Sequence, residues 1–275
     1  MKQKTLLALI AFISLVVLSS HNLFIKLKSF HLNPETEATI YLYNGTFDKS
    51  EAILARNRMK DVSLINPGEK RMHPNNSSWF EENNQTVLKF KTGKEGTGVL
   101  GVSTTSRVNN FKAESFIDNM KHEGLLQVLE DREKSGEATK PVRKKYSKHV
   151  KAIFQVGNTV SEDYKTVLGY PIELVPLNNP YDLKIGDELS MQLLIHGKPM
   201  AGEMVYASYN NQHGHAKDGT PLDAFKVLTD SDGIVKVTIS TAGHWYFRTV
   251  NLIKSTENDA DYISLSAAIT FEITK

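Results

Sequence analysis

The chain has 275 residues, of which 40% are hydrophobic and 23% are charged. These proportions are near the average for soluble globular proteins, so they exclude a chain that is disordered throughout, a collagen-like fibre and a polytopic membrane protein. Lysine and arginine number 33 against 31 acidic residues. Because Lys2 and Lys4 lie in a segment that we expect to be removed, the mature chain carries 31 charges of each sign. This balance does not indicate nucleic acid as a partner.

The first 20 residues have the three-part order of a secretory signal peptide. A short positive region precedes an uncharged apolar run over 6–18, and Ser19 and Ser20 supply small residues before His21. The apolar run of about 13 residues is shorter than the ~20 that a membrane-spanning helix needs, which favours cleavage over a permanent anchor. We therefore predict a signal peptide over 1–20, cleaved after Ser19 or Ser20, and a periplasmic protein that is soluble after cleavage.

The chain contains no cysteine. This excludes disulfides, thiolate metal ligands and a cysteine nucleophile. An exported protein of this size can rely on its hydrophobic core alone.

The pattern after the signal divides the chain into three parts, beginning with an N-terminal β domain over 21–111. Apolar and polar residues alternate over 23–28 and 86–91, and β-branched and aromatic residues fill 39–43 before the turn-like Asn44-Gly45. The polar stretch 66–84 is rich in Asn, Ser, Pro and Gly, which indicates a long loop.

Residues 112–155 are predicted to be a helical segment. Apolar residues recur at spacings of three and four from Phe116 to Leu129, with Gly124 dividing the helix. A second amphipathic helix is predicted from Val142 to Phe154. Its opposite face would carry Arg143, Lys144, Lys145, Lys148 and Lys151. That face is interpreted as solvated in preference to an anion-binding patch.

The last part, 156–275, is predicted to be a C-terminal β-sandwich domain. Seven short strands are expected at 172–175, 189–195, 204–209, 225–228, 234–239, 245–253 and 263–273. Their number and spacing are typical of an immunoglobulin-like or transthyretin-like sandwich. The predicted class is therefore mainly β, with a C-terminal sandwich, a β-rich N-terminal domain and a helical insertion between them.

Two motif matches carry little weight. Residues 96–101 read GTGVLG, which fits G-x-G-x-x-G, but strand-like residues follow where a dinucleotide site needs a helix. Residues 230–233 begin like a calcium loop but lack its later glycine and glutamate. Lipase, zinc-protease and P-loop motifs are also absent from the sequence. We therefore do not expect an enzyme.

The histidines offer the most informative chemistry. His213 and His215 flank Gly214, so their rings can converge from either a strand or a loop. Neutral imidazole is the commonest metal ligand and suits nickel, cobalt, copper and zinc. The alternative is a polar hairpin loop with two solvated histidines.

Two further histidines complete the candidate metal ligands. Cleavage after Ser20 would make His21 the N-terminal residue, which chelates through its α-amine and ring Nδ1; the alternative is a frayed terminus. His244 would share one strand face with Tyr246 and Arg248, with Trp245 and Phe247 facing the core. It either completes a metal site or lies on the surface. His31, His73, His122, His149 and His196 have neither neighbours nor spacing that suggests a site.

The order of motifs resembles the DUF4198 family, exported proteins similar to the periplasmic component of nickel or cobalt uptake systems. The resemblance spans essentially the mature chain. It rests on the stretches 21–24 (HNLF), 44–47 (NGTF), 146–151 (YSKHVK), 168–176 (LGYPIELVP), 179–181 (NPY), 197–202 (GKPMAG), 229–233 (TDSDG), 243–248 (GHWYFR) and 259–262 (DADY).

The resemblance implies a β-sandwich architecture and a periplasmic role in transition-metal uptake. Proteins of the nickel-uptake group chelate metal near a processed N-terminus, a role that His21 would take here. His213 and His215 lie where relatives often have a histidine-rich loop. A transport role would require a separate membrane permease or an outer-membrane receptor as partner, and the oligomeric state stays open.

Two functions follow as hypotheses. In the first, an exported protein captures Ni²⁺ or Co²⁺, or else Cu²⁺ or Zn²⁺, through its histidines and presents the ion to a membrane partner. In the second, the protein is a cell-envelope module that binds a protein or glycan, and its histidines are incidental.

Overall fold

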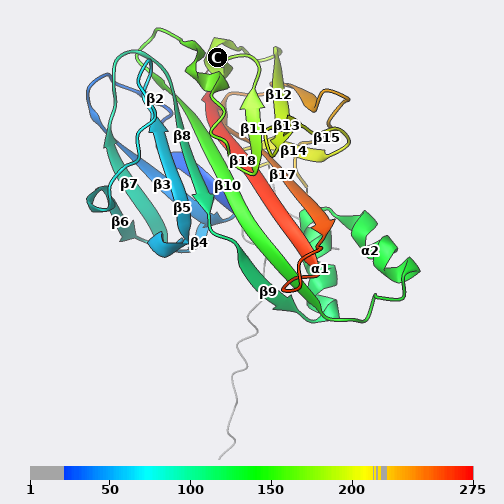
Figure 1. Cartoon of the computed structure of the whole chain (residues 1–275). Helices are drawn as coiled ribbons and strands as arrows, with labels where there is room; N and C mark the ends of the chain where they lie inside the picture. The colour runs from blue at the N-terminus through cyan, green and yellow to red at the C-terminus, as the bar shows by residue number, and fades with distance from the viewer. Residues whose placement is uncertain (1–21, 213, 215, 218–221, 275) are drawn as a thin grey trace, which may run out of the picture.

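The computed structural model describes residues 22–212, 214, 216, 217 and 222–274. Strands dominate this part of the chain and form three sheets (Figure 1). The mainly β class predicted from the sequence is confirmed. Among the described residues, no helix is both long and apolar enough to cross a membrane.

The first sheet belongs to the N-terminal part of the chain. Its strands run in the order β1-β3-β7-β6, with β4 paired to β3. Their bounds are β1 (Asn22–Leu27), β3 (Glu37–Gly45), β4 (Ser50–Ala52), β6 (Trp79–Glu82) and β7 (Gln85–Lys91). The strands predicted at 23–28, 39–43 and 86–91 are confirmed as β1, β3 and β7. Burial alternates along β3, whereas β1 is buried on both faces, since Leu23, Phe24 and Ile25 all lie in one core.

The second sheet is the largest and runs through both halves of the molecule. Its main order is β15-β14-β17-β18-β10-β8-β5, with β2 and β9 also paired to β10. The bounds are β2 (His31–Leu32), β5 (Met59–Ile65), β8 (Gly96–Thr104), β9 (Arg107–Phe111), β10 (Val142–Val156), β14 (Met204–Tyr209), β15 (Phe225–Leu228), β17 (Gly243–Lys254) and β18 (Tyr262–Ile273). The long strands β10 and β18 pair in parallel and join the two halves.

The third sheet forms the second layer of the C-terminal sandwich. It consists of β11 (Ile172–Pro176), β12 (Glu188–Ile195), β13 (Lys198–Pro199) and β16 (Ile234–Thr238). Together with β14, β17 and β18 it encloses one apolar core. All seven strands predicted for this part of the chain are confirmed, with ends that differ by at most two residues.

The second sheet is buried on both faces along β17. Trp245 and Phe247 point into the C-terminal core, whereas Tyr246 points into the N-terminal core. The predicted alternation of this strand is therefore confirmed. The face that carries Tyr246 and Arg248 is covered by other parts of the chain, since both side chains are buried.

The predicted helix from Val142 to Phe154 is wrong, because this segment is the central strand β10. Val150, Ala152 and Phe154 face the N-terminal core, and Ile153 faces the C-terminal core. A strand that is buried on both faces shows apolar residues at mixed spacings, which imitates a helical period.

The lysines of β10 are also placed differently from the predicted solvated face. Lys144 and Lys151 are buried, 4% and 2% exposed, and Lys151 pairs with Glu173 at 3.2 Å. Arg143 and Lys145 pair with acidic residues near the start of β18. These charges are divided between the two faces and do not form one basic patch.

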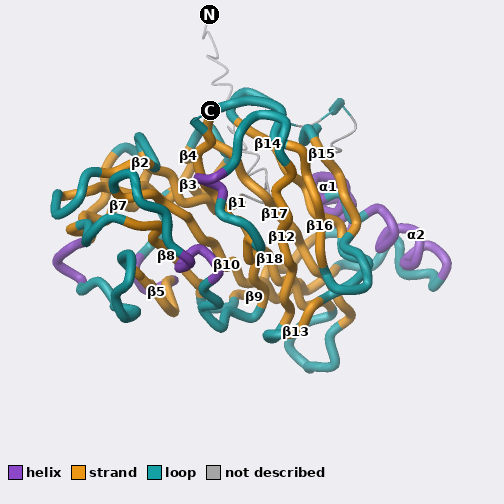
Figure 2. Tube along the Cα trace, turned by 90° about the horizontal axis from the view of Figure 1, so that it is seen from above, coloured by secondary structure: helices purple, strands orange, loops and turns teal. Residues whose placement is uncertain are grey.

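Two α-helices lie beside the large sheet, α1 (Ala113–Glu123) and α2 (Leu126–Lys134). Gly124 ends α1 with φ of 76°, a left-handed conformation that glycine adopts without strain. Figure 2 shows both helices on the opposite side of the molecule from β7. The short 3-10 helices are η1 (Arg56–Arg58), η2 (Asn76–Ser78), η3 (Glu162–Lys165) and η4 (Pro180–Asp182).

Candidate functional site

A small pocket of about 70 Å³ lies where the N-terminal strands meet β17 and the end of α1. Six separate stretches of the chain contribute to its wall. The lining residues are Asn22, Phe24, Gly45, Thr46, Phe47, His122, Gly214, Asp223, Tyr246 and Arg248. The pocket is far smaller than the roughly 300–1,000 Å³ of pockets for drug-sized ligands, so its size suits an ion or a few atoms.

The wall formed by β1 and the end of β3 is fixed by backbone pairing. Asn22 pairs with Gly45, where a side chain would lie 2.5 Å from the Lys49 carbonyl oxygen. Only glycine therefore fits at this bulge. The chain then turns, and the amide of Thr46 donates to the Lys49 carbonyl at 2.9 Å.

An aromatic cluster closes one side of the pocket. The rings of Phe24 and Phe47 have centroids 5.3 Å apart in an edge-to-face arrangement, and the Tyr246 ring lies 4.5 Å from that of Phe47. All three side chains are almost fully buried. This wall shields the pocket from water and strengthens electrostatic interactions inside it.

A buried charged network forms another side. Asp223 accepts hydrogen bonds from Arg248 Nη2 at 2.6 Å and from the Tyr246 hydroxyl. Burial alone would lower the pKa of Arg248, but the adjacent Asp223 carboxylate raises it above its ordinary value. Burial and the same carboxylate raise the pKa of Tyr246. The two side chains form a buried ion pair, so together they add little net charge to the pocket.

His122 supplies an imidazole to the pocket from the last turn of α1. The carbonyl end of a helix attracts positive charge. Next to it, Glu123 is buried and faces Lys144 and Lys148 across a second, smaller cavity. Burial lowers the pKa of Lys148 to about 8, although the Glu123 charge opposes this shift.

Three of the four predicted metal ligands, His21, His213 and His215, lie outside the described residues. Their described neighbours in sequence do converge. Asn22 follows His21 directly, Gly214 is bonded to both other histidines, and Asn22 and Gly214 line the same pocket. Among the described residues, no group of three or more His, Asp or Glu side chains is arranged to hold a metal ion.

The fourth predicted ligand, His244, lies elsewhere. Its Nε2 atom is 3.7 Å from Glu272 Oε1, and its ring packs edge-on against Phe30 with centroids 5.0 Å apart. His31 approaches the other oxygen of Glu272, with Nδ1 at 3.8 Å. Burial lowers the pKa of His244, with Lys26 adding to the effect.

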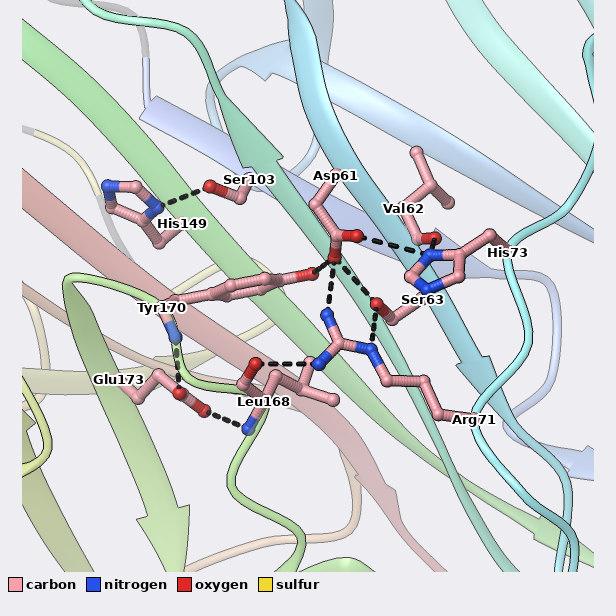
Figure 3. Close-up of polar contacts among 10 residues, drawn as sticks. All are labelled: Asp61, Val62, Ser63, Arg71, His73, Ser103, His149, Leu168, Tyr170 and Glu173. Carbon is pink, nitrogen blue, oxygen red and sulfur yellow. Dashed lines mark hydrogen bonds and ion pairs between the residues drawn. The ribbon is translucent and has the colours of Figure 1, made fainter.

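A second polar cluster joins β5 to the segment before β11 (Figure 3). Asp61 Oδ2 accepts from Ser63 at 2.6 Å, Tyr170 at 2.7 Å and Arg71 at 2.8 Å. Its other oxygen lies 3.1 Å from His73 Nδ1. Donors thus surround this carboxylate, and the Arg71 guanidinium also donates to the Leu168 carbonyl. We interpret the cluster as a structural junction.

The sequence reasoning missed His122 as a candidate ligand. It has no histidine partner nearby in sequence, and its position at the pocket arises from contacts between distant segments. The buried pair of Asp223 and Arg248 was also missed. Of this pair, the sequence pattern places only Arg248, on the strand face opposite Trp245 and Phe247.

Comparisons with known proteins identify a family. A family model described as "Domain of unknown function (DUF4198)" matches residues 18–252. No curated protein matches the chain.

Three solved structures are similar at 12% sequence identity. The D0-D1 domain of intimin aligns over 91% of this chain and 97% of its own, with a TM-score of 0.21. The adhesin InvE of Yersinia pseudotuberculosis aligns over 91% and 58%, with a TM-score of 0.22. Escherichia coli alpha-2-macroglobulin aligns over 93% and 20%, with a TM-score of 0.22. At such TM-scores these likenesses carry no argument about function.

Proposed function

The chain belongs to the DUF4198 family, and from this premise we propose that it is an exported protein that binds a divalent transition metal. The metal is nickel or cobalt, with copper and zinc as competing ions. The protein captures the ion in the periplasm and presents it to a membrane permease or an outer-membrane receptor.

One observation carries the proposal. Asn22 and Gly214, which are covalently bonded to three predicted ligands, line the same pocket as the imidazole of His122. In the sequence His21 directly precedes Asn22, and His213 and His215 flank Gly214. The proposed ligand set is therefore His21, His122, His213 and His215.

The chemistry of this set suits the proposed ions. Imidazole nitrogens bind nickel, cobalt, copper and zinc, and a free α-amine at His21 would add another nitrogen ligand. The Asp223–Arg248 pair leaves little net charge to repel a cation. His244 is left out of the set, because it does not line this pocket and its Nε2 atom faces Glu272.

Calorimetric titration of the mature chain with Ni²⁺, Co²⁺, Cu²⁺ and Zn²⁺ tests the proposal. We expect at least one ion to bind with micromolar affinity or better. His21→Ala and His122→Ala should each weaken that binding at least about tenfold, which corresponds to 1.4 kcal/mol.

His196→Asn is the matched control. His196 is exposed in a turn with φ of 49°, a conformation that asparagine also tolerates, and it does not line the pocket. The control should bind metal like the unaltered chain. Absence of binding by all four ions would refute the metal-binding role. The intact mass of the exported protein tests separately whether cleavage leaves His21 at or next to the N-terminus.

A further inference from the structure

Two polar side chains are in contact in the interior between α1 and the first half of β10. Lys144 is 4% exposed and Asn119 is 3% exposed. Lys144 Nζ donates a hydrogen bond to Asn119 Oδ1, across 25 positions of the sequence. A lysine this deeply buried usually pairs with a carboxylate, whereas the group that Nζ contacts here is a neutral amide.

The surroundings of this contact are apolar. Lys144 lies two residues after Val142 on β10, so both side chains lie on the same face of the strand. Nζ is 5.2 Å from the centroid of the Phe111 ring. Val142 belongs to a buried cluster that also includes two residues of α1 beside Asn119. The members of this cluster are Phe111, Phe116, Met120, Val142 and Tyr262.

Burial changes the chemistry of the Lys144 amine. Removal from water penalises the charged form and lowers the pKa of Lys144, with the Glu123 charge opposing the shift. A larger fraction of the amine is then neutral and carries a free electron pair on Nζ. A neutral lysine amine in an apolar site is a nucleophile towards carbonyl carbons.

The Asn119 side chain presents the matching electrophile. Because Oδ1 is bonded to Cγ, the hydrogen bond holds Nζ beside the carbon atom of the amide. The amide nitrogen Nδ2 is buried and has no hydrogen-bond partner in the described part of the chain. A buried donor without an acceptor costs free energy, and loss of this nitrogen as ammonia would remove that cost.

Glu123 completes the arrangement. It lies one helical turn after Asn119, so the two side chains share one face of α1. Glu123 is 4% exposed, and it lines the same cavity of about 20 Å³ as Lys144. Its carboxylate is thus placed to carry a proton between the two nitrogen atoms.

We propose that Lys144 and Asn119 form an intramolecular isopeptide bond. The neutral Nζ attacks Asn119 Cγ, and the bond between Cγ and Nδ2 breaks. The proton that Nζ loses passes through Glu123 to Nδ2, and ammonia leaves. The product is a secondary amide between the two side chains. The step involves neither oxidation nor reduction, and it needs no co-reactant.

Such a bond would join α1 covalently to β10. It would close a loop that contains α2 and restrict the unfolded chain, as a disulfide does in proteins that contain cysteine. This chain has no cysteine. The proposal does not depend on metal binding, so the two can fail independently.

Mass spectrometry of the mature, folded chain tests the proposal. Bond formation releases ammonia, so the chain should be lighter than its sequence by about 17 Da. After denaturation and digestion with trypsin, residues 113–121 should remain joined to residues 144–145 in one branched peptide. Lys144→Met and Asn119→Ala should each have the full mass of their sequences.

Two results from the unaltered chain would overturn the proposal, whether or not the variants fold. The first is a chain of full mass that yields these two peptides separately. The second is a loss of ammonia within residues 113–121 alone, which would mark cyclisation of Asn119 onto its own backbone.

A second contact between a lysine and an asparagine provides the matched control. Lys148 Nζ donates to Asn44 Oδ1 at 3.1 Å, but Asn44 is only half-buried. Residues 29–49 and 146–148 should therefore appear as separate tryptic peptides. Linkage of this pair in place of the first would contradict the assignment to Lys144 and Asn119.

Discussion

Asp223 and Arg248 form an ion pair with 2.6 Å between Oδ2 and Nη2, and their side chains are only 2% and 6% exposed. Asp223 comes from the segment before β15 and Arg248 from β17. Arg248 also lines the small pocket that contains His122. The pair therefore contributes both to the stability of the fold and to the shape of the candidate site.

Removing one member of this pair should destabilise the protein strongly. Asp223→Ala leaves the Arg248 guanidinium buried without its counter-charge, and we expect the free energy of unfolding to fall by about 3–5 kcal/mol. Urea denaturation measures this change. Glu188→Ala breaks the exposed pair with Lys236 and should cost no more than about 1 kcal/mol. Similar losses in the two variants would show that burial of the Asp223 pair has no special effect.

The second prediction concerns stability in mild acid. His149 is buried between the hydroxyl groups of Ser103 and Ser147, each 2.9 Å from a ring nitrogen. Burial lowers its pKa from 6.5 to about 4, with Lys60 contributing. Below pH 6.5 the unfolded chain therefore binds a proton that the folded chain refuses, so stability falls as the pH drops from about 6.5 to about 4. The loss should be about 3 kcal/mol in total.

His149→Gln isolates this effect, because glutamine can bond to both hydroxyl groups but does not titrate. Chemical denaturation at several pH values should give a flatter profile for the variant across this window. Carboxylates still titrate at the acidic end in both proteins, so the difference between the two curves is the relevant quantity. Parallel curves would assign the acid sensitivity to other groups.

The strands of the C-terminal sandwich could be predicted because their signals are local. β14 and β15 match the expected ranges residue for residue, and turns bound each of them. Short edge strands are harder to predict from the sequence. β6 (Trp79–Glu82) lies inside the stretch predicted as a loop, and Asn83 and Asn84, with φ of 47° and 61°, form the tight turn that pairs it with β7.

The candidate site could be predicted only in part, since it depends on contacts between distant segments. His122 has no distinguishing neighbour in sequence, and it reaches the pocket because α1 ends at Gly124 beside β1 and β17. Lys26 follows the alternation of a solvent-facing strand residue. It is buried because Phe47, from the turn after β3, lies against its amine. Neither arrangement produces a pattern that can be recognised in the neighbouring sequence.

The third prediction concerns Gly98 in the glycine-rich strand β8, where close packing leaves no room for a side chain. A side chain at Gly98 would lie 2.3 Å from Phe154 Cζ and 3.0 Å from the Ile65 carbonyl oxygen. Phe154 is fully buried, so it has little room to move. Gly98→Ala should therefore lower the free energy of unfolding by about 1–3 kcal/mol in urea denaturation.

A double variant tests this cause. Phe154→Leu shortens the opposing side chain, and the combined loss with Gly98→Ala should be smaller than the sum of the two separate losses. Additive losses would mean that the glycine is required for a reason other than contact with this ring.

The fourth prediction uses heat stability to examine the proposed metal site. An ion that binds only the folded chain stabilises it by about 2.7 kcal/mol at one hundred times its Kd. For a chain of this size, the melting temperature at pH 7.5 should rise by roughly 5–10 °C when Ni²⁺ is added. A chelator should reverse the rise, and His122→Ala should reduce it by more than half, whereas His196→Asn should preserve it. Protons compete with a metal ion for imidazole nitrogens, and free imidazole is mostly protonated at pH 5, so the rise should nearly disappear at that pH. A rise of equal size at both pH values would point to carboxylate ligands and would contradict the histidine site.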